Sequence, residues 1–297
     1  MSVTPLAAHV STQSAAFRGR IGRDARSGHY AVPRRYRLHL STACPDGLRI
    51  AVAHALLGLD DSCPATFLPP IPDCTDGGHA VLRPLYDASA HRYAGPALAP
   101  VLSDDWSGRI VSTHAPDITR DLARRFACGR PDLYPSGAES EIEAVERMCA
   151  QGIEEAAQGA GAPGARPAER DEALGTLLRA LGALDRWLDG RTHMLRHQIT
   201  AADVELWVTL VQLDTVHRHH LDAAAVQRVA AHPALWDYAR RLTADPAFGA
   251  HLDLDAIARR HHARCQGLEA AGAAVQILDW TAHAAAGTEA RPRVQGY

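Results

Sequence analysis

The chain has 297 residues, is 46% hydrophobic and 22% charged, and carries a formal net charge of −3. This composition is typical of a globular protein with room for two domains, and the charge gives no reason to expect nucleic acid or an acidic membrane surface as a partner. No apolar run approaches the roughly 20 residues that a membrane helix needs. The N-terminal stretch lacks the basic and apolar regions of a signal peptide, so we expect a cytoplasmic protein.

The cysteines are spread along the chain, and no two of them have the spacing of a Cys-x-x-Cys motif. Scattered cysteines fit free thiols in a reducing compartment better than they fit a disulfide framework. The six are Cys44, Cys63, Cys74, Cys128, Cys149 and Cys265. Only Cys44 has sequence surroundings that predict thiol chemistry.

The first recognisable element is an alternating run, Tyr36–Leu40, which predicts a strand. After a short connection, Pro45 opens a run with helical periodicity, and proline suits the first position of a helix because its missing N–H costs nothing there. Cys44 would then face unpaired N–H groups and the positive end of the helix dipole. Such surroundings can lower a cysteine pKa from about 8.5 to roughly 3.5–7.5. We therefore predict that Cys44 is a reactive thiol, with an inert buried cysteine as the alternative.

The rest of the first half contains further short elements. Residues 60–79 are rich in Pro, Gly and Asp and are expected to be loop, and residues 79–86 are expected to hold a short strand. Two apolar runs, 99–102 and 109–111, are joined by a polar turn and predict a hairpin. A helix is expected over 115–126, with a proline near its first position.

From Glu139 onward the pattern is almost entirely helical. Residues 157–168 interrupt it with a Gly- and Ala-rich stretch that is expected to be a linker or loop. Thr200, with Asp203 three residues later, resembles a capping box and precedes a strongly apolar helix that we expect at the centre of this half. Further helices are expected over 169–189, from Pro233 onward and over 253–264.

This order of elements resembles the glutathione transferases, and within them the glutathionyl-hydroquinone reductases, or Xi class. The resemblance spans residues 17–282, and its matching stretches include 35–49, 99–102, 109–118, 133–135, 200–216, 232–242 and 253–260. It implies an α/β thioredoxin-like domain followed by an all-α domain, and usually a homodimer. The domain limits that follow are 1–15 for a flexible arm, 16–130 for the thioredoxin-like domain, 131–284 for the helical domain and 285–297 for a disordered tail.

The resemblance also implies which residues would hold a small thiol. Cys44 and Pro45 match the first half of the family's Cys-Pro-Trp-Ala motif, whereas Asp46 and the glycine after it depart from the motif. Pro100 matches a cis-proline that would leave the backbone of Val101 free to pair with a bound thiol, and a simple edge-strand proline is the alternative. The fourth motif position holds no second cysteine, which favours a monothiol cycle through a mixed disulfide.

The family carries an adjacent Glu-Ser pair where this chain has His114-Ala115, and that pair holds the γ-glutamyl group of glutathione. A His-Ala pair cannot supply both a carboxylate and a hydroxyl. The thiol is therefore expected to be either glutathione or mycothiol, in which a sugar–inositol head replaces γ-Glu and Gly. The residues expected to bind it are Pro45, Asp46, Pro100, Val101, Thr113 and His114.

Histidines stand where the family has tyrosines that line the quinone pocket. His217, His261 and His262 occupy these positions, which predicts a rebuilt substrate pocket. Imidazole titrates near neutral pH and can act as a general acid or base. With the neighbouring His219-His220 and Cys265 these residues also raise the alternative of a zinc site. No metal is expected, because no carboxylate partner is evident.

Three functions are compatible with these residues. We expect first a transferase or reductase that acts through the Cys44 thiolate, uses a low-molecular-weight thiol and takes an aromatic or quinone-like small molecule. The second is a specialised biosynthetic (tailoring) enzyme with a histidine-rich pocket. The third is a non-catalytic protein that binds a ligand or partner, since a fold does not fix a function.

Overall fold

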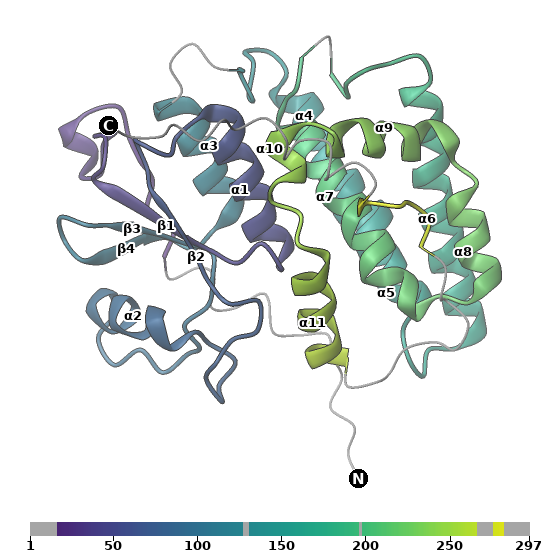
Figure 1. Ribbon diagram of the computed structural model, residues 1–297, viewed down its shortest axis with the longest axis horizontal. Coiled ribbons are helices and arrows are strands. Elements are labelled where there is room, and N and C mark those ends of the chain that lie inside the picture. Colours follow the sequence, from purple (N-terminus) through teal and green to yellow (C-terminus); the bar gives the residue numbers. More distant parts are fainter. Residues whose placement is uncertain (1–16, 127–130, 196–197, 266–275, 282–297) are drawn as a thin grey trace, which may run out of the picture.

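A four-stranded sheet organises the first half of the chain in the computed structural model (Figure 1). Its strands are β1 (Tyr36–Leu40), β2 (Ala65–Phe67), β3 (Val101–Asp104) and β4 (Arg109–Ser112), in the order β2-β1-β3-β4. β2 runs parallel to β1, whereas β1, β3 and β4 alternate in direction. The structure describes residues 17–126, 131–195, 198–265 and 276–281. The expected arm and tail, and Cys128, lie outside these residues.

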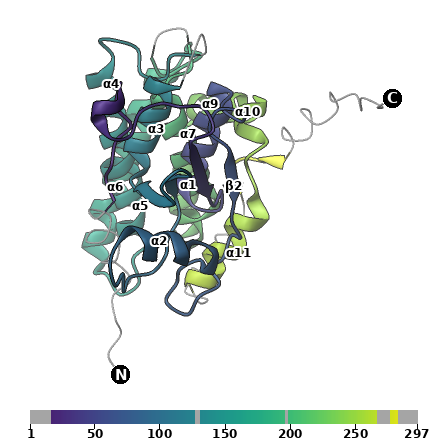
Figure 2. The ribbon, with the colours of Figure 1, turned by 90° about the vertical axis from the view of Figure 1, so that its left-hand side faces the viewer.

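Helices cover both faces of this sheet (Figures 1 and 2). α1 (Pro45–Leu57) and α3 (Ala115–Arg125) pack on each other over one face, and α2 (Arg83–Ser89) lies against the other. Between the sheet and α2, Phe17 and Tyr86 meet edge to face with ring centroids 5.5 Å apart, in a small apolar cluster of their own. The first half therefore has the α/β layers of a thioredoxin-like domain.

The predicted strand at 36–40, the helix from Pro45, the hairpin and the helix from Ala115 are confirmed. Two other predictions for this half are wrong. Residues 65–67 form β2 inside the predicted loop, because three residues carry no periodicity of their own and the strand depends on the open edge of β1. The strand expected within 79–86 is instead a 3₁₀ turn, Ala80–Leu82, followed by α2, whose proline occupies the first turn.

The strand register brings four connecting segments to one edge of the sheet. His39 lies opposite Val101, and Leu40 lies opposite Phe67, so β1 and β2 end where β3 begins. β4 ends at the same edge because Leu102 lies opposite Ser112. We call this the thiol edge. The segments that leave or enter the sheet there are 41–44, 68–70, 99–100 and 113–114.

The second half is helical and lies beside the sheet domain (Figure 1). Its elements are α4 (Glu139–Arg147), a π-helical stretch (Met148–Glu155), α5 (Ala156–Ala160), α6 (Pro167–Leu188), α7 (Ala201–Thr215), η4 (His217–His220), α8 (Ala223–Ala230), α9 (Pro233–Thr243), α10 (Pro246–Gly249) and α11 (Leu254–Cys265). The expected linker at 157–168 is therefore shorter than predicted, because helix continues to Ala160. Of the helices that the structure describes, none is both long and apolar enough to span a bilayer.

α7 is the central helix of this half, as predicted. Every residue of α7 is buried except Glu205. The predicted capping box is confirmed at its start, where Asp203 accepts hydrogen bonds from the Thr200 N–H and hydroxyl at 2.8 and 2.9 Å. Asp203 also accepts from the Tyr238 hydroxyl at 2.7 Å, which fixes α9 against α7. A buried carboxylate is stable there because several donors surround it.

A second buried carboxylate near the end of α7 holds the last described segment of the chain. Asp214 accepts from the backbone N–H groups of Ile277 and Leu278 and from the Trp280 indole N–H at 2.9–3.0 Å. The Trp280 ring packs edge to face on Trp207, with centroids 6.4 Å apart. Residues 276–281 are thus fixed to the helical core beyond α11.

Candidate active site

Cys44 is the N-cap residue of α1 at the thiol edge, with Pro45 in the first position of the helix. Its Sγ accepts a hydrogen bond from the Gly47 N–H at 3.3 Å, and its own N–H donates to the Ser41 carbonyl oxygen at 3.1 Å. Gly47 is required by this tight loop, because a Cβ at that position would lie 2.1 Å from the Ser41 oxygen. The predicted placement of the thiol at a helix start is therefore correct.

The pKa of Cys44 differs from the sequence expectation. The residue is only 7% exposed, and burial raises the pKa of its thiol, with a further rise from the Asp46 carboxylate. The Arg260 guanidinium, the Gly47 N–H and Arg264 act in the opposite direction without cancelling this rise. The expected low pKa was wrong because the helix terminus acts on a thiol that has lost its water.

The peptide bond between Ala99 and Pro100 is cis, as the resemblance implied. Val101, however, lies inside the sheet opposite His39 and is fully buried. The main-chain groups of Ala99 make no hydrogen bond within the part of the chain that the structure describes. The backbone that remains open at the thiol edge is therefore that of Ala99, and the pairing role expected of Val101 suits Ala99 better.

His114 is held in a network of charged side chains. Its Nδ1 lies 2.9 Å from Asp117 Oδ2 and 3.0 Å from the Arg18 guanidinium. Asp117 is itself bound by Arg18 and Arg20. Thr113 donates its N–H to the Phe17 carbonyl at 2.9 Å, so this turn is tied to the segment that precedes the sheet. The family's Glu-Ser pair would stand at this turn. Here the nearby carboxylate, that of Asp117, is already paired with arginines.

Asp46 belongs to a cluster of carboxylates around one arginine at the boundary between the two halves. Arg49 forms ion pairs with Asp46, Glu154 and Glu205 at 2.9, 2.7 and 2.8 Å. The Thr209 hydroxyl donates to Glu154 at 3.1 Å. Burial, with help from the neighbouring acids, raises the pKa of Glu205 to about 7 although Arg49 opposes the rise. Asp46, Arg49 and Glu205 line a cavity of about 210 Å³, which we call the carboxylate cavity, and Glu154 and Thr209 bind to this cluster from outside the lining.

The predicted pocket histidines are only partly brought together. The His261 ring stacks on His219 at 5.6 Å and meets His220 edge to face at 5.0 Å, so α11 and η4 do place imidazoles side by side. Burial and the neighbouring imidazoles lower the pKa of His217 to about 4, which keeps it neutral. His262 is exposed. None of the histidines predicted for the substrate pocket lines either cavity described in this section, and their role in a pocket stays a prediction.

Within the described ranges, no group of three or more His, Cys, Asp or Glu side chains has the arrangement of a metal site. The other described cysteines do not resemble Cys44. Burial raises the pKa of Cys63 to about 12 and that of Cys149 well above its usual value, as expected for buried structural thiols. Cys74 is partly exposed and lies in a loop.

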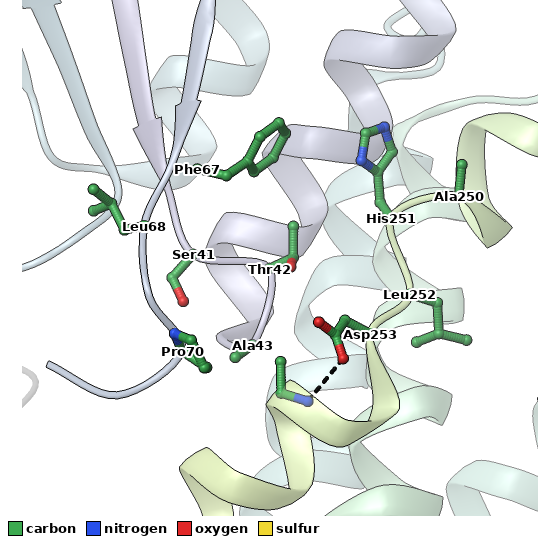
Figure 3. A pocket seen from close by; sticks show the side chains of 11 residues that line it. Ser41, Thr42, Ala43, Phe67, Leu68, Pro70, Ala250, His251, Leu252 and Asp253 are labelled. Atoms are coloured by element: carbon green, nitrogen blue, oxygen red, sulfur yellow. Dashed lines mark hydrogen bonds between the residues drawn. The ribbon is translucent and has the colours of Figure 1, made fainter.

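A second cavity, of about 310 Å³, lies directly beside the Cys44 loop, and we call it the thiol-edge cavity (Figure 3). Ser41, Thr42 and Ala43 form one wall, and the segment between α10 and α11 forms another. Among the lining residues the Phe67 ring stacks on His251, with centroids 5.9 Å apart and 30° between the planes. Sequence reasoning missed this wall because β2, which positions Phe67, was not predicted.

Comparisons with known proteins agree with this architecture. Residues 167–241 match the family model of the glutathione S-transferase C-terminal domain. The glutathionyl-hydroquinone reductase PcpF of Sphingobium chlorophenolicum is 28% identical over 232 residues, which cover 72% of this chain and 72% of that protein. The glutathionyl-hydroquinone reductase YqjG of Escherichia coli is 26% identical over 264 residues, which cover 83% of this chain and 80% of that protein.

Solved structures share this fold. A glutathione transferase from Gordonia bronchialis superimposes with a TM-score of 0.74 at 26% identity, covering 84% of this chain and 83% of that one. The glutathione-bound structure of Escherichia coli YqjG also gives a TM-score of 0.74, at 24% identity, over 85% of this chain and 89% of that one. The chain therefore has the fold of the glutathione S-transferases, with a thioredoxin-like first half and a helical second half, and it is similar in sequence to glutathionyl-hydroquinone reductases.

Proposed function

We propose that the protein is a thiol-dependent reductase or transferase in which Cys44 removes a thiol group from a quinone-like aromatic compound. The observation that carries the proposal is the position of Cys44, at the N-cap of α1 directly after the residues that line the thiol-edge cavity. The names of the relatives, glutathionyl-hydroquinone reductases, support the reaction class. The stacked Phe67 and His251 rings at the thiol-edge cavity suit a flat aromatic partner.

The proposed chemistry needs one cysteine. The Cys44 thiolate attacks the sulfur of an aryl thioether, a Cys44–S–S–R mixed disulfide forms, and the carbon–sulfur electron pair leaves with the ring, which takes up a proton. A second molecule of thiol then attacks the mixed disulfide and releases Cys44 with a small disulfide. Gly47 stands at the position where a dithiol enzyme has its second cysteine, so a disulfide within a Cys-x-x-Cys motif is excluded.

Cys44 must lose its proton in this reaction, although burial raises its pKa. The Gly47 N–H at 3.3 Å is already directed at the sulfur and stabilises the thiolate once it forms. The positive charge of Arg260 acts in the same direction. We infer that the thiolate becomes the favoured state only when a bound substrate adds its own interactions at the thiol edge.

Replacement of Cys44 by serine tests the proposal. The Cys44→Ser variant is expected to lose at least about 1,000-fold in turnover of a glutathionyl-hydroquinone, because a hydroxyl cannot form the mixed disulfide. The matched control is Cys74→Ser, which alters a loop thiol away from the thiol edge and should keep full activity. Mass spectrometry of the trapped wild-type adduct should place the thiol on Cys44. Equal turnover by wild type and Cys44→Ser would refute the proposal.

The identity of the thiol forms a separate prediction. At the His114 turn, Asp117 is occupied by Arg18, Arg20 and His114, so the γ-glutamyl ammonium finds no free carboxylate there. We therefore predict that glutathione binds more weakly than mycothiol, by roughly tenfold for one lost charge-assisted hydrogen bond. Calorimetric titration of Cys44→Ser with each thiol measures the difference. Tighter binding of glutathione would contradict the prediction and leave the role of Cys44 intact.

A further inference from the structure

Three buried polar atoms near Cys44 have no hydrogen-bond partner among the residues that the structure describes. They are Ser41 Oγ, His79 Nδ1 and Arg260 Nε. Ser41 is 1% exposed and His79 is 2% exposed, so water does not reach them freely. A buried polar group without a partner costs roughly 1–3 kcal/mol. Several of them in one region indicate that a ligand supplies the missing partner.

Ser41 lines the thiol-edge cavity, whereas Arg260 and His79 lie behind its lining and are connected to it through neighbouring residues. Ser41 lines the cavity, and Figure 3 shows its hydroxyl on the same side as Pro70. Arg260 donates from Nη1 to the Pro70 carbonyl at 3.0 Å. Ala256, one turn before Arg260 on α11, also lines the cavity. His79 lies within electrostatic reach of Arg260, whose charge helps to lower the imidazole pKa.

The charge of this region favours an anion. Burial lowers the pKa of the Arg260 guanidinium, and within the described chain this side chain forms no ion pair with a carboxylate. Asp253 is the one acidic residue of the cavity wall, and its carboxylate accepts the Ala256 N–H at 2.8 Å at the start of α11 (Figure 3). A desolvated guanidinium without a counter-ion binds carboxylates strongly.

We propose that Ser41, His79 and Arg260 form an anion subsite that holds a carboxylate of the molecule reacting at Cys44. Three free donors are available to a carboxylate oxygen: the Ser41 hydroxyl, the Arg260 Nε–H and the His79 Nδ1–H. His79 donates from Nδ1 in the tautomer that carries the proton there. The inference rests on the proposed reactivity of Cys44 and adds the charge of its substrate. The carboxylate belongs either to the small thiol or to the aromatic compound.

Model disulfides test the subsite without the natural substrate. The Cys44 thiolate attacks one sulfur of R–S–S–R, forms Cys44–S–S–R and releases R–S⁻, and mass spectrometry follows the adduct. Wild type should react faster with dithiodipropionate, which carries carboxylates, than with hydroxyethyl disulfide or with cationic cystamine, by roughly tenfold or more.

Inhibition by benzoate, an aromatic carboxylate, is the second test of the subsite. Inhibition of the hydroxyethyl disulfide reaction by benzoate assigns the carboxylate to the aromatic compound, and preference for dithiodipropionate without such inhibition assigns it to the thiol.

Variants connect the preference to two of the three residues, Arg260 and Ser41. Arg260→Met should abolish the preference for the anionic disulfide, Arg260→Lys should keep part of it, and Ser41→Ala should reduce it severalfold. The matched control is Arg259→Met, which removes an exposed charge next to Arg260 and should keep the wild-type preference. If Arg260→Met fails to fold, Ser41→Ala carries the test alone.

The outcomes separate the two proposals. A wild type that shows neither a preference for dithiodipropionate nor inhibition by benzoate overturns the subsite, as does a preference that survives in both Arg260→Met and Ser41→Ala. A protein whose Cys44 reacts with none of the disulfides overturns the proposed function instead.

Discussion

The thiol-edge cavity and the carboxylate cavity differ in whether the protein itself supplies partners for their buried polar groups. At the carboxylate cavity Arg49 forms ion pairs with three acids at 2.7–2.9 Å, so that even its Nε, which makes no hydrogen bond, has a carboxylate beside it, and Thr209 adds a hydrogen bond to one of the acids. Beside the thiol-edge cavity, Ser41, His79 and Arg260 each keep an unused polar atom. Both cavities are bounded by segments of both halves of the chain.

The difference indicates which cavity serves binding and which serves structure. When the protein supplies all the partners of a charged group, the removal of one partner is costly, and a ligand would have to displace one of them. A group whose partners are missing gains when a ligand arrives. Substitutions at the two cavities should therefore separate stability from binding.

The largest expected effect is on the carboxylate cavity. Arg49→Met should lower the free energy of unfolding by about 3–5 kcal/mol at pH 7, because it leaves Glu154 and Glu205 partly buried without their cation. Denaturant unfolding measures the loss. Arg179→Met, on the exposed face of α6, is the control and should change stability by less than about 0.5 kcal/mol. A loss in Arg49→Met no larger than in the control would remove the distinction between the cavities.

The second effect is a change in pH dependence. Because the folded-state pKa of Glu205 is raised from 4.5 to about 7, the folded protein holds a proton that the unfolded chain has lost, and stability falls as pH rises between these values. Glu205→Gln keeps the shape and removes the titration. It should flatten the stability–pH curve between pH 5 and 8 by up to about 3 kcal/mol. A curve parallel to that of the wild type would show that Glu205 titrates normally.

The smallest effect compares two hydroxyls. Thr209→Val removes a buried hydrogen bond to Glu154 and should cost about 1–2 kcal/mol. Ser41→Ala removes a buried hydroxyl that has no partner among the described residues, so it should leave the free energy of unfolding unchanged within about 0.5 kcal/mol or raise it. Thermal unfolding of both variants in the same buffer measures the contrast. Equal losses would mean that the Ser41 hydroxyl is as well satisfied as that of Thr209.

Much of the fold was predictable because its strongest elements have local signals. The 36–40 strand alternates, Pro45 and Pro116 mark helix starts, and the Thr200–Asp203 box precedes an apolar helix. β2 was missed because a three-residue strand exists only through its neighbour. The candidate site is assembled by strand register and by packing between distant segments. No local sequence pattern contains this information.

The site itself was predicted only in part. The helix start identified Cys44, but its raised pKa follows from burial by segments distant in sequence. Which residue of 259–262 lies toward Cys44 depends on the rotation of α11 about its axis. Arg260 lies one turn after the cavity residue Ala256, whereas the His261 ring stacks on His219 of η4. The resemblance implied a pocket role for the histidines and none for Arg260.

The contacts of Asp214 with Ile277, Leu278 and Trp280 have a consequence for protein synthesis. The ribosome completes the sheet and Cys44 early, and the first domain of a chain generally folds first. One wall of the thiol-edge cavity is formed by the segment between α10 and α11, and Arg260 lies on α11. The segment that follows α11 can bind Asp214 only after Trp280 has been synthesised. Until then the newly made chain carries Cys44 uncovered on that side, so oxidants and alkylating agents should modify this thiol more readily during translation than in the finished protein.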